Sequence, residues 1–149
     1  MKIALAGDHR GFRLKDFLVN ILKDKGHEII DFGTHSSDSC DYPDYTYPAS
    51  VAVRDKKCER AILVCYSGIG SAIVANKVKG VRAALAYTVK SAVLSRKHND
   101  SNILVLPAYM LKKEQVKRIV FSWLKAEFEG GRHARRVNKI KEIEEKENV

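Results

Sequence analysis

A cysteine, two hydroxyl side chains and two glycines lie within seven residues of one another, Cys65 to Ser71, in the order Cys-Tyr-Ser-Gly-Ile-Gly-Ser. The apolar run before them, residues 61–64, has the length and branched content of a strand that is buried on both faces. A helix is expected from Ala72 onward. Glycines between a strand and a helix let a ligand approach the backbone, and the first amides of the helix point free N–H groups at it. The segment therefore predicts a turn that binds phosphate, a carboxylate or an enolate oxygen.

Two common phosphate-binding motifs do not match this turn. A nucleotide-hydrolase loop ends in Gly-Lys followed by Ser or Thr, and a dinucleotide fingerprint needs a third glycine where this chain has Ile73. The plain alternative is a tight turn beside a core cysteine, because free cysteine is among the most often buried residue types.

The elements around the turn alternate between strands and helices. Strands are expected at residues 2–7, 28–32, 61–65, 83–86 and 103–106. Helices are expected at 12–26, from about 48, from 72, up to about 98, at 116–124 and from about 134. This alternation predicts a doubly wound, Rossmann-like three-layer α/β sandwich, with a five-stranded parallel sheet and a C-terminal helical extension. We expect residues 1–149 to form a single domain, since the length fits one.

Ligands of such sheets bind beyond the carboxyl ends of the strands. Asp8 and His9 follow the first expected strand, the polar loop containing Tyr42 follows the second, and the glycine turn follows the third. His98 and Asn99 instead precede the fifth strand, so topology alone does not place them at the same site.

Composition narrows the classes of partner. The formal net charge of +9 favours anionic ligands, and leaves both nucleic acid and sugar phosphate open. The apolar runs are too short for a membrane span and the chain enters its first strand without a leader, so we expect a cytoplasmic protein with no membrane contact. Cys40, Cys58 and Cys65 show neither zinc-ligand nor disulfide spacing, which favours reduced thiols.

Five motifs together resemble the type B ribose-5-phosphate isomerases, and the resemblance covers essentially the whole chain. They are Gly7-Asp8-His9, Asp41-Tyr42-Pro43, Cys65 to Lys77, Ser95 to Asp100, and Glu129-Gly130-Gly131-Arg132-His133. The resemblance implies isomerisation of a sugar phosphate through a cis-enediolate, as in the pentose phosphate pathway, without metal or organic cofactor. It also implies a homodimer, or a dimer of dimers, whose active sites are built from both subunits.

The resemblance assigns the proton transfer to the turn. Cys65 matches the base of the cysteine-using branch, and a helix N-terminus favours the thiolate form of such a residue. Another branch uses a glutamate where this chain has Ser71, which cannot take a proton from carbon. Ser67 stands in a position that is often threonine and passes a proton between the enediol oxygens. The amides of Gly68, Ile69, Gly70 and Ser71 would stabilise the developing oxyanion.

The remaining expected contacts belong to the sugar and its phosphate. His98 matches the residue that opens the furanose ring; its plain alternative is an imidazole at a helix C-terminus. Asp8 and Asn99 match contacts to sugar hydroxyls, and Tyr42 lines the same pocket, although Asp8 could simply cap a helix. The phosphate-binding set matches His9, Arg132 and Arg136, the arginines offering paired donors to phosphate oxygens.

The chain departs from the family pattern at two places, and both should change the choice of substrate more than the isomerisation itself. Tyr66 stands where the family usually has glycine, at the border of the expected substrate site. Pro107-Ala108-Tyr109 replaces a Gly-Ser-Arg pattern whose arginine contributes to phosphate binding. A six-carbon substrate, such as allose or galactose 6-phosphate, is therefore the nearest alternative. A non-catalytic module that binds phosphate or nucleic acid is an alternative of a different class.

Overall fold

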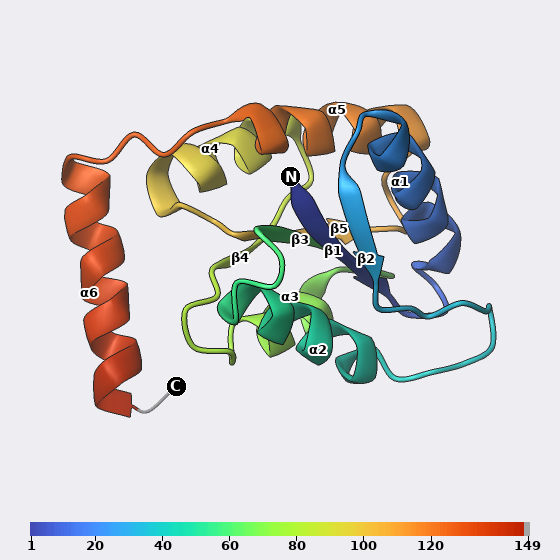
Figure 1. The fold of residues 1–149 in the computed structure, drawn as a ribbon, viewed down its shortest axis with the longest axis horizontal. Helices are drawn as coiled ribbons and strands as arrows, with labels where there is room; N and C mark the ends of the chain where they lie inside the picture. Colours follow the sequence, from blue (N-terminus) through green and yellow to red (C-terminus); the bar gives the residue numbers. More distant parts are fainter. Residues whose placement is uncertain (148–149) are drawn as a thin grey trace.

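The computed structural model describes residues 1–147, and Figure 1 shows their fold. Five parallel strands form one sheet in the order β2-β1-β3-β5-β4. The strands are β1 (Lys2–Gly7), β2 (Glu28–Asp31), β3 (Arg60–Cys65), β4 (Ala83–Leu85) and β5 (Ile103–Pro107). The helices are α1 (Phe12–Asp24), α2 (Pro43–Arg54), α3 (Ile69–Ala75), α4 (Val89–Asn99), α5 (Lys113–Lys125) and α6 (Arg132–Glu147). The predicted α/β fold class is confirmed; the last two residues of the expected domain lie outside the described part.

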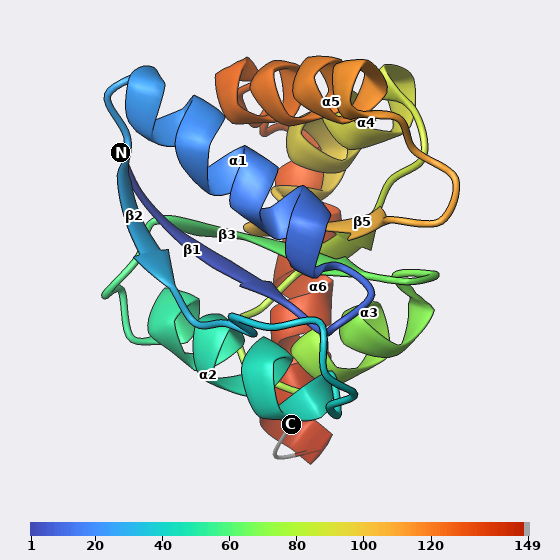
Figure 2. The same cartoon turned by 90° about the vertical axis from the view of Figure 1, so that its right-hand side faces the viewer.

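Helices cover both faces of the sheet, and Figure 2 shows the resulting layers. Alternate residues of each strand point to opposite faces. Ile3 and Leu5 of β1 pack with α1 and α5, in a cluster that includes the fully buried Trp123. Ala4 and Ala6 pack toward α2 and α3 in a second cluster. Small side chains on this second face let α2 and α3 lie close to the sheet, at the end where the glycine turn follows β3.

Four helices begin earlier than predicted, among them α5, which starts at Lys113 instead of Val116. α2 starts at Pro43, and Pro48, the expected start, lies inside it. A proline at the first helical position has no N–H to lose, so Pro43 is a favourable start for a segment that looks like a polar loop. α3 starts at Ile69 instead of Ala72, and α6 starts at Arg132 instead of Ala134. Tyr42, expected within a long loop, therefore occupies the N-cap position of α2, where its side chain makes no capping hydrogen bond.

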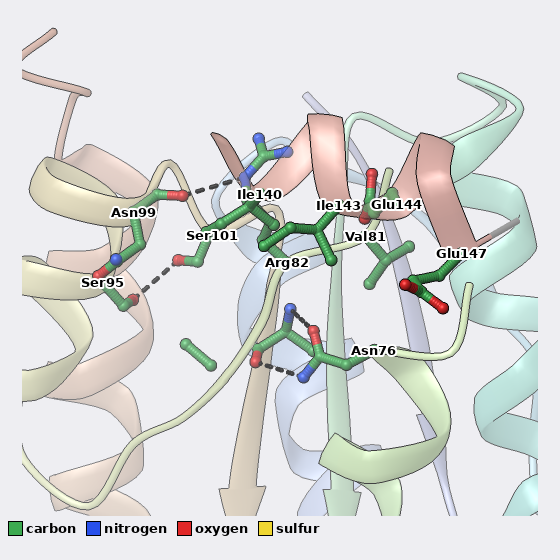
Figure 3. A pocket seen from close by; sticks show the side chains of 12 residues that line it. Asn76, Val81, Arg82, Ser95, Asn99, Ser101, Ile140, Ile143, Glu144 and Glu147 are labelled. Carbon is green, nitrogen blue, oxygen red and sulfur yellow. Dashed lines mark hydrogen bonds between the residues drawn. The ribbon is translucent and has the colours of Figure 1, made fainter. Parts of the chain in front are cut away.

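The short edge strand β4 is closed on its outer side by a side chain. The amide of Asn76 donates to the Ala83 carbonyl at 2.9 Å and accepts from the Ala83 N–H at 2.9 Å, as the dashed lines in Figure 3 show. These are the two hydrogen bonds that a neighbouring strand would make. The Asn76 side chain thus makes the two hydrogen bonds to Ala83 that a sixth strand would otherwise make.

Helix α6 lies apart from the two helical layers, beside this edge (Figure 1). Glu144 accepts a hydrogen bond from the Gly80 N–H at 3.2 Å, and a hollow of about 520 Å³ remains between α6 and β4. Ile140 and Ile143 point into it, and 39% and 59% of their surfaces are exposed. Across residues 1–147, we find no helix with the length and apolar character that a membrane crossing requires.

Candidate active site

The Cys65 thiol lies at the carboxyl end of β3, in the middle of the sheet. Cys65 is opposite Pro107 of β5, and only 4% of its surface is exposed. The turn that follows folds back over it, and the Gly68 N–H donates to Sγ at 3.1 Å. Gly68 has φ +78°, and a Cβ there would collide with Cδ1 of Leu85. The chain therefore needs glycine at this position to aim an amide at the sulfur.

The turn offers further donors beside the thiol. The Ile69 N–H donates to Oγ of Ser67 at 3.3 Å, while the amides of Gly70 and Ser71 have no acceptor among residues 1–147. The Ser71 hydroxyl is buried and accepts a hydrogen bond from Thr46 at 3.1 Å. Ser71 can therefore donate a hydrogen bond from its backbone amide to a ligand, whereas its hydroxyl is already hydrogen-bonded to Thr46 of α2.

Tyr42 lies over the turn. A Cβ on Gly70 would come within 2.5 Å of Cζ of the Tyr42 ring, so the two residues pack directly against each other. This contact joins the loop after β2 to the turn after β3. The expectation that Tyr42 borders the same pocket is consistent with this packing.

Asp8 and His9 are fixed by the loop that follows β1. Oδ1 of Asp8 accepts from the N–H groups of Arg10 at 3.0 Å and Gly11 at 2.8 Å, so the carboxylate caps the approach to α1. Nδ1 of His9 accepts from the Cys40 N–H at 3.2 Å. A neutral imidazole with an accepting Nδ1 carries its proton on Nε2, which leaves His9 one donor for a ligand.

The other expected site residues, His98, Asn99, Arg132 and Arg136, lie at the opposite end of the sheet. Helix α4 runs antiparallel to the strands, and the Asn102 carbonyl just after it accepts from the Ala61 N–H at the start of β3. The length of β3 separates this end from Cys65 by roughly 15 Å, at about 3.3 Å per residue. One chain therefore holds the expected site as two separate halves.

At this second end, two histidines and a carboxylate form a compact cluster. The rings of His98 and His133 stack with centroids 4.1 Å apart and planes 7° from parallel. Nε2 of each ring lies 3.7 Å from Oε2 of Glu129, whose other oxygen accepts from Lys97 Nζ at 3.0 Å. Glu129 thus holds both imidazoles and is itself held by a lysine.

Charge and burial shift the protonation of this cluster. The hydrogen bond from Lys97, with the charges of Lys97 and the two histidines, lowers the pKa of Glu129. Burial lowers the pKa of His133, and His98, Arg132 and Arg136 lower it further. Glu129 therefore stays ionised, while His133 favours the neutral form.

The same three side chains have a metal-ligand composition, since their ligand atoms lie within 4.8 Å of one another. Stacked, nearly parallel imidazoles direct their lone pairs along parallel planes, so they do not converge on one ion. The exposed Arg132 and Arg136 at the start of α6 add positive charge. The arrangement fits an anion better than a cation.

Sequence reasoning gave no role to Glu129, His133, Thr46 or Arg10. Glu129 and His133 lie within a quoted motif, but their contact with His98 joins α4 to the start of α6 and has no local signal. Thr46 lies in a segment expected to be a loop. Arg10 follows His9 directly, and only the structure shows that its guanidinium carbon lies 4.8 Å from the centre of the Tyr66 ring.

Comparison with known proteins gives consistent matches over nearly the whole chain. Residues 3–140 match the family described as Ribose/Galactose Isomerase. The chain is 44% identical to Ribose-5-phosphate isomerase B of Escherichia coli (strain K12), over 99% of both chains. It is 42% identical to a putative sugar phosphate isomerase of Bacillus subtilis (strain 168), over 98% of this chain and 99% of the relative.

Solved structures are equally similar. Ribose-5-Phosphate Isomerase B of Clostridium thermocellum superposes with a TM-score of 0.97 at 49% identity, covering 98% of this chain and 99% of the other. The Mycoplasma genitalium enzyme, with bound ribulose-5-phosphate, gives 0.93 at 39% identity and covers 97% and 96%. Both the fold and the sequence place this protein among them, and the chain belongs to the ribose/galactose isomerase family.

Proposed function

We propose that the protein interconverts ribose 5-phosphate and ribulose 5-phosphate. The observation that carries the proposal is the Cys65 thiol, held at 3.1 Å by the Gly68 amide beside the unpaired amides of Gly70 and Ser71. A base next to free donors suits proton abstraction beside a carbonyl, with stabilisation of the enediolate oxygen that forms. Solved relatives named as this enzyme, one of them with bound ribulose-5-phosphate, support the choice of substrate.

The residues of the turn divide the reaction between them. The Cys65 thiolate takes the proton from C2 of the open-chain aldose and returns it to C1 of the enediolate. The Ser67 hydroxyl carries a proton between the two enediol oxygens. The amides of Gly70 and Ser71 hold the charged oxygen, and Tyr42 and Ile69 border the sugar. No step requires a metal or an organic cofactor.

The second half of the site comes from another copy of the chain. His98 would open the furanose ring, Asn99 would contact a hydroxyl, and Arg132 and Arg136 would bind phosphate together with His9. These groups lie roughly 15 Å from Cys65 within one chain. A symmetric homodimer, alone or paired into a tetramer, would join each half to its complement across the interface. The exposed Ile140 and Ile143 on α6 are available for such an interface.

Turnover without added metal tests the reaction. Purified protein should interconvert the two pentose phosphates, and should act more slowly on allose 6-phosphate and galactose 6-phosphate. Faster turnover of a six-carbon substrate would reassign the specificity and keep the chemistry. No turnover of any sugar phosphate, with salt-sensitive retention on heparin, would favour the non-catalytic binding module.

Mixing two inactive variants tests the shared site. Cys65→Ala and His98→Gln each remove a different half, so neither homodimer has an intact site. After unfolding and refolding together, about a quarter of wild-type turnover should return, because half of the dimers are mixed and each has one intact site. Recovery near zero would overturn the shared site and leave the assignment of Cys65 untouched.

The cellular setting follows from the reaction. The two sugar phosphates are interconverted in the pentose phosphate pathway, and we propose that the protein acts there in the cytoplasm as one isomerase domain. Its partner is then a small sugar phosphate, with neither nucleic acid nor membrane involved.

A further inference from the structure

A hollow of about 290 Å³ opens at the carboxyl end of the sheet, beside the residues that follow β3 and β5. It is lined by Arg10, Tyr66, Ala108 and Tyr109. The Ala108 N–H donates to the Cys65 carbonyl at 2.9 Å, and the Tyr109 N–H donates to the Tyr66 carbonyl at 3.1 Å. The pairing of β3 with β5 thus continues for two residues beyond the strands. The hollow is therefore fixed to the Cys65 backbone.

Two tyrosine rings form one wall of this hollow. Tyr66 and Tyr109 lie with ring centroids 5.2 Å apart and planes 39° from parallel, and about half of each residue is exposed. Aromatic residues this exposed at the mouth of a site provide a surface for a ligand or for another side chain. Here the Tyr66 ring supports a cation.

The cation is Arg10. Its guanidinium carbon lies 4.8 Å from the centre of the Tyr66 ring, a cation–π distance. The nearby Asp8 carboxylate is engaged by the backbone amides of Arg10 and Gly11. Among residues 1–147, the Arg10 guanidinium has neither a hydrogen bond nor a salt bridge. Its donors are therefore oriented by the ring and available to a ligand.

The lining of the hollow determines the kind of ligand. It contains one positive charge, two phenol hydroxyls and no carboxylate. A guanidinium presents paired donors that match the oxygens of a phosphate group. His9, the neighbour of Arg10 in the sequence, is already expected to bind phosphate. The lining of the hollow therefore matches the phosphate group of a phosphate monoester.

We propose that Arg10, seated on Tyr66, binds the phosphate group of the substrate and is a specificity-determining residue of the site. This inference rests on the proposed function, because it assumes that the molecule reaching Cys65 is a sugar phosphate. It adds a charged phosphate contact to the Cys65 half of the site, where His9 is the other expected one. Arg132 and Arg136 would supply contacts from the other half.

The test compares Arg10→Met with Arg13→Met, which removes an exposed arginine three residues later on α1. Arg10→Met should raise KM for ribose 5-phosphate by roughly 10- to 100-fold, the loss expected for a hydrogen-bonded charge, and should change kcat less than threefold. The inhibition constant of inorganic phosphate should rise in parallel. Tyr66→Leu should give a smaller rise in KM, because it removes the aromatic ring that orients the Arg10 guanidinium but keeps the guanidinium itself.

Equal KM and phosphate inhibition in the two arginine variants would overturn the assignment of Arg10 and leave the proposed function standing. If the wild-type protein turned over no sugar phosphate, the proposed function would fail and alkylation of Cys65 would decide the inference. Inorganic phosphate should slow iodoacetamide labelling of Cys65 in the wild type and not in Arg10→Met, as measured by mass spectrometry. Labelling that phosphate slows equally in both proteins, or in neither, would contradict the phosphate contact.

Discussion

The two ends of the sheet carry the two halves of the candidate site, and the two halves consist of different kinds of chemical group. At the carboxyl end, the groups around Cys65 are mostly backbone amides, fixed by a glycine with positive φ. At the amino end, His98, Glu129 and His133 are side chains held by one another across two helices. The first half depends on a local turn and the second on tertiary contact. Mutations should therefore affect them differently.

The largest expected difference comes from removing the thiol. Cys65→Ala should lower kcat by roughly 10²- to 10⁴-fold, the usual contribution of a positioned acid or base. The control is Cys58→Ala, because Cys58 is also buried but packs with α2 on the second face of the sheet. Steady-state kinetics and circular dichroism should show a folded, inactive protein for Cys65→Ala and an active one for Cys58→Ala. Turnover retained by Cys65→Ala would refute its role as base.

The geometry of the turn should show the next largest effect. Gly68→Ala places a Cβ against Leu85 at φ +78°, whereas Gly80→Ala has nearly the same φ, +79°, and open space. Both pay backbone strain, so Gly80→Ala should lower the free energy of unfolding by about 1–2 kcal/mol. Gly68→Ala should cost roughly 1–3 kcal/mol more, because the core must shift. Urea denaturation and turnover measure both, and we expect only Gly68→Ala to lose activity.

The amino end should be sensitive to its carboxylate. Glu129→Gln keeps the size of the side chain but removes the charge that holds the two imidazoles, so His98 loses its fixed position. Misplacement of a catalytic group on this scale lowers kcat by roughly 10- to 100-fold. The melting temperature should barely change, since Glu129 is an exposed partner. A large drop in melting temperature, with kcat preserved, would show that the cluster serves stability alone.

The smallest expected effect is a pH dependence of stability. Burial holds the pKa of His133 below its ordinary value of 6.5, so the unfolded chain binds a proton more readily than the native one. This contribution to stability is present above pH 6.5 and is lost as the pH falls toward the lowered pKa. In denaturant titrations between pH 8 and 5, His133→Asn should flatten this decline. An unchanged profile would mean that other groups cause it.

The same contrast explains what the sequence could predict. Continuous apolar runs predicted β3 and β5, and the glycines after β3 predicted the amide-lined turn, because both signals are local. The start of α2 at Pro43 was missed, since Asp41 to Tyr45 has loop composition and Pro48 suggests a boundary. The contacts of Glu129 with His98 and His133 join distant segments, so no spacing rule could reveal them. The same holds for the placement of Arg10 on Tyr66.

The side chain that closes the sheet has a consequence for solubility. An open strand edge is a template on which another chain can pair, and this is a common route to fibrils. Asn76 occupies both hydrogen-bonding groups of Ala83, so β4 offers little backbone for such growth. A second copy of the chain therefore finds few free backbone groups at Ala83 with which to extend the sheet. The β4 edge is a poor template for the strand pairing by which a misfolded molecule recruits its neighbours.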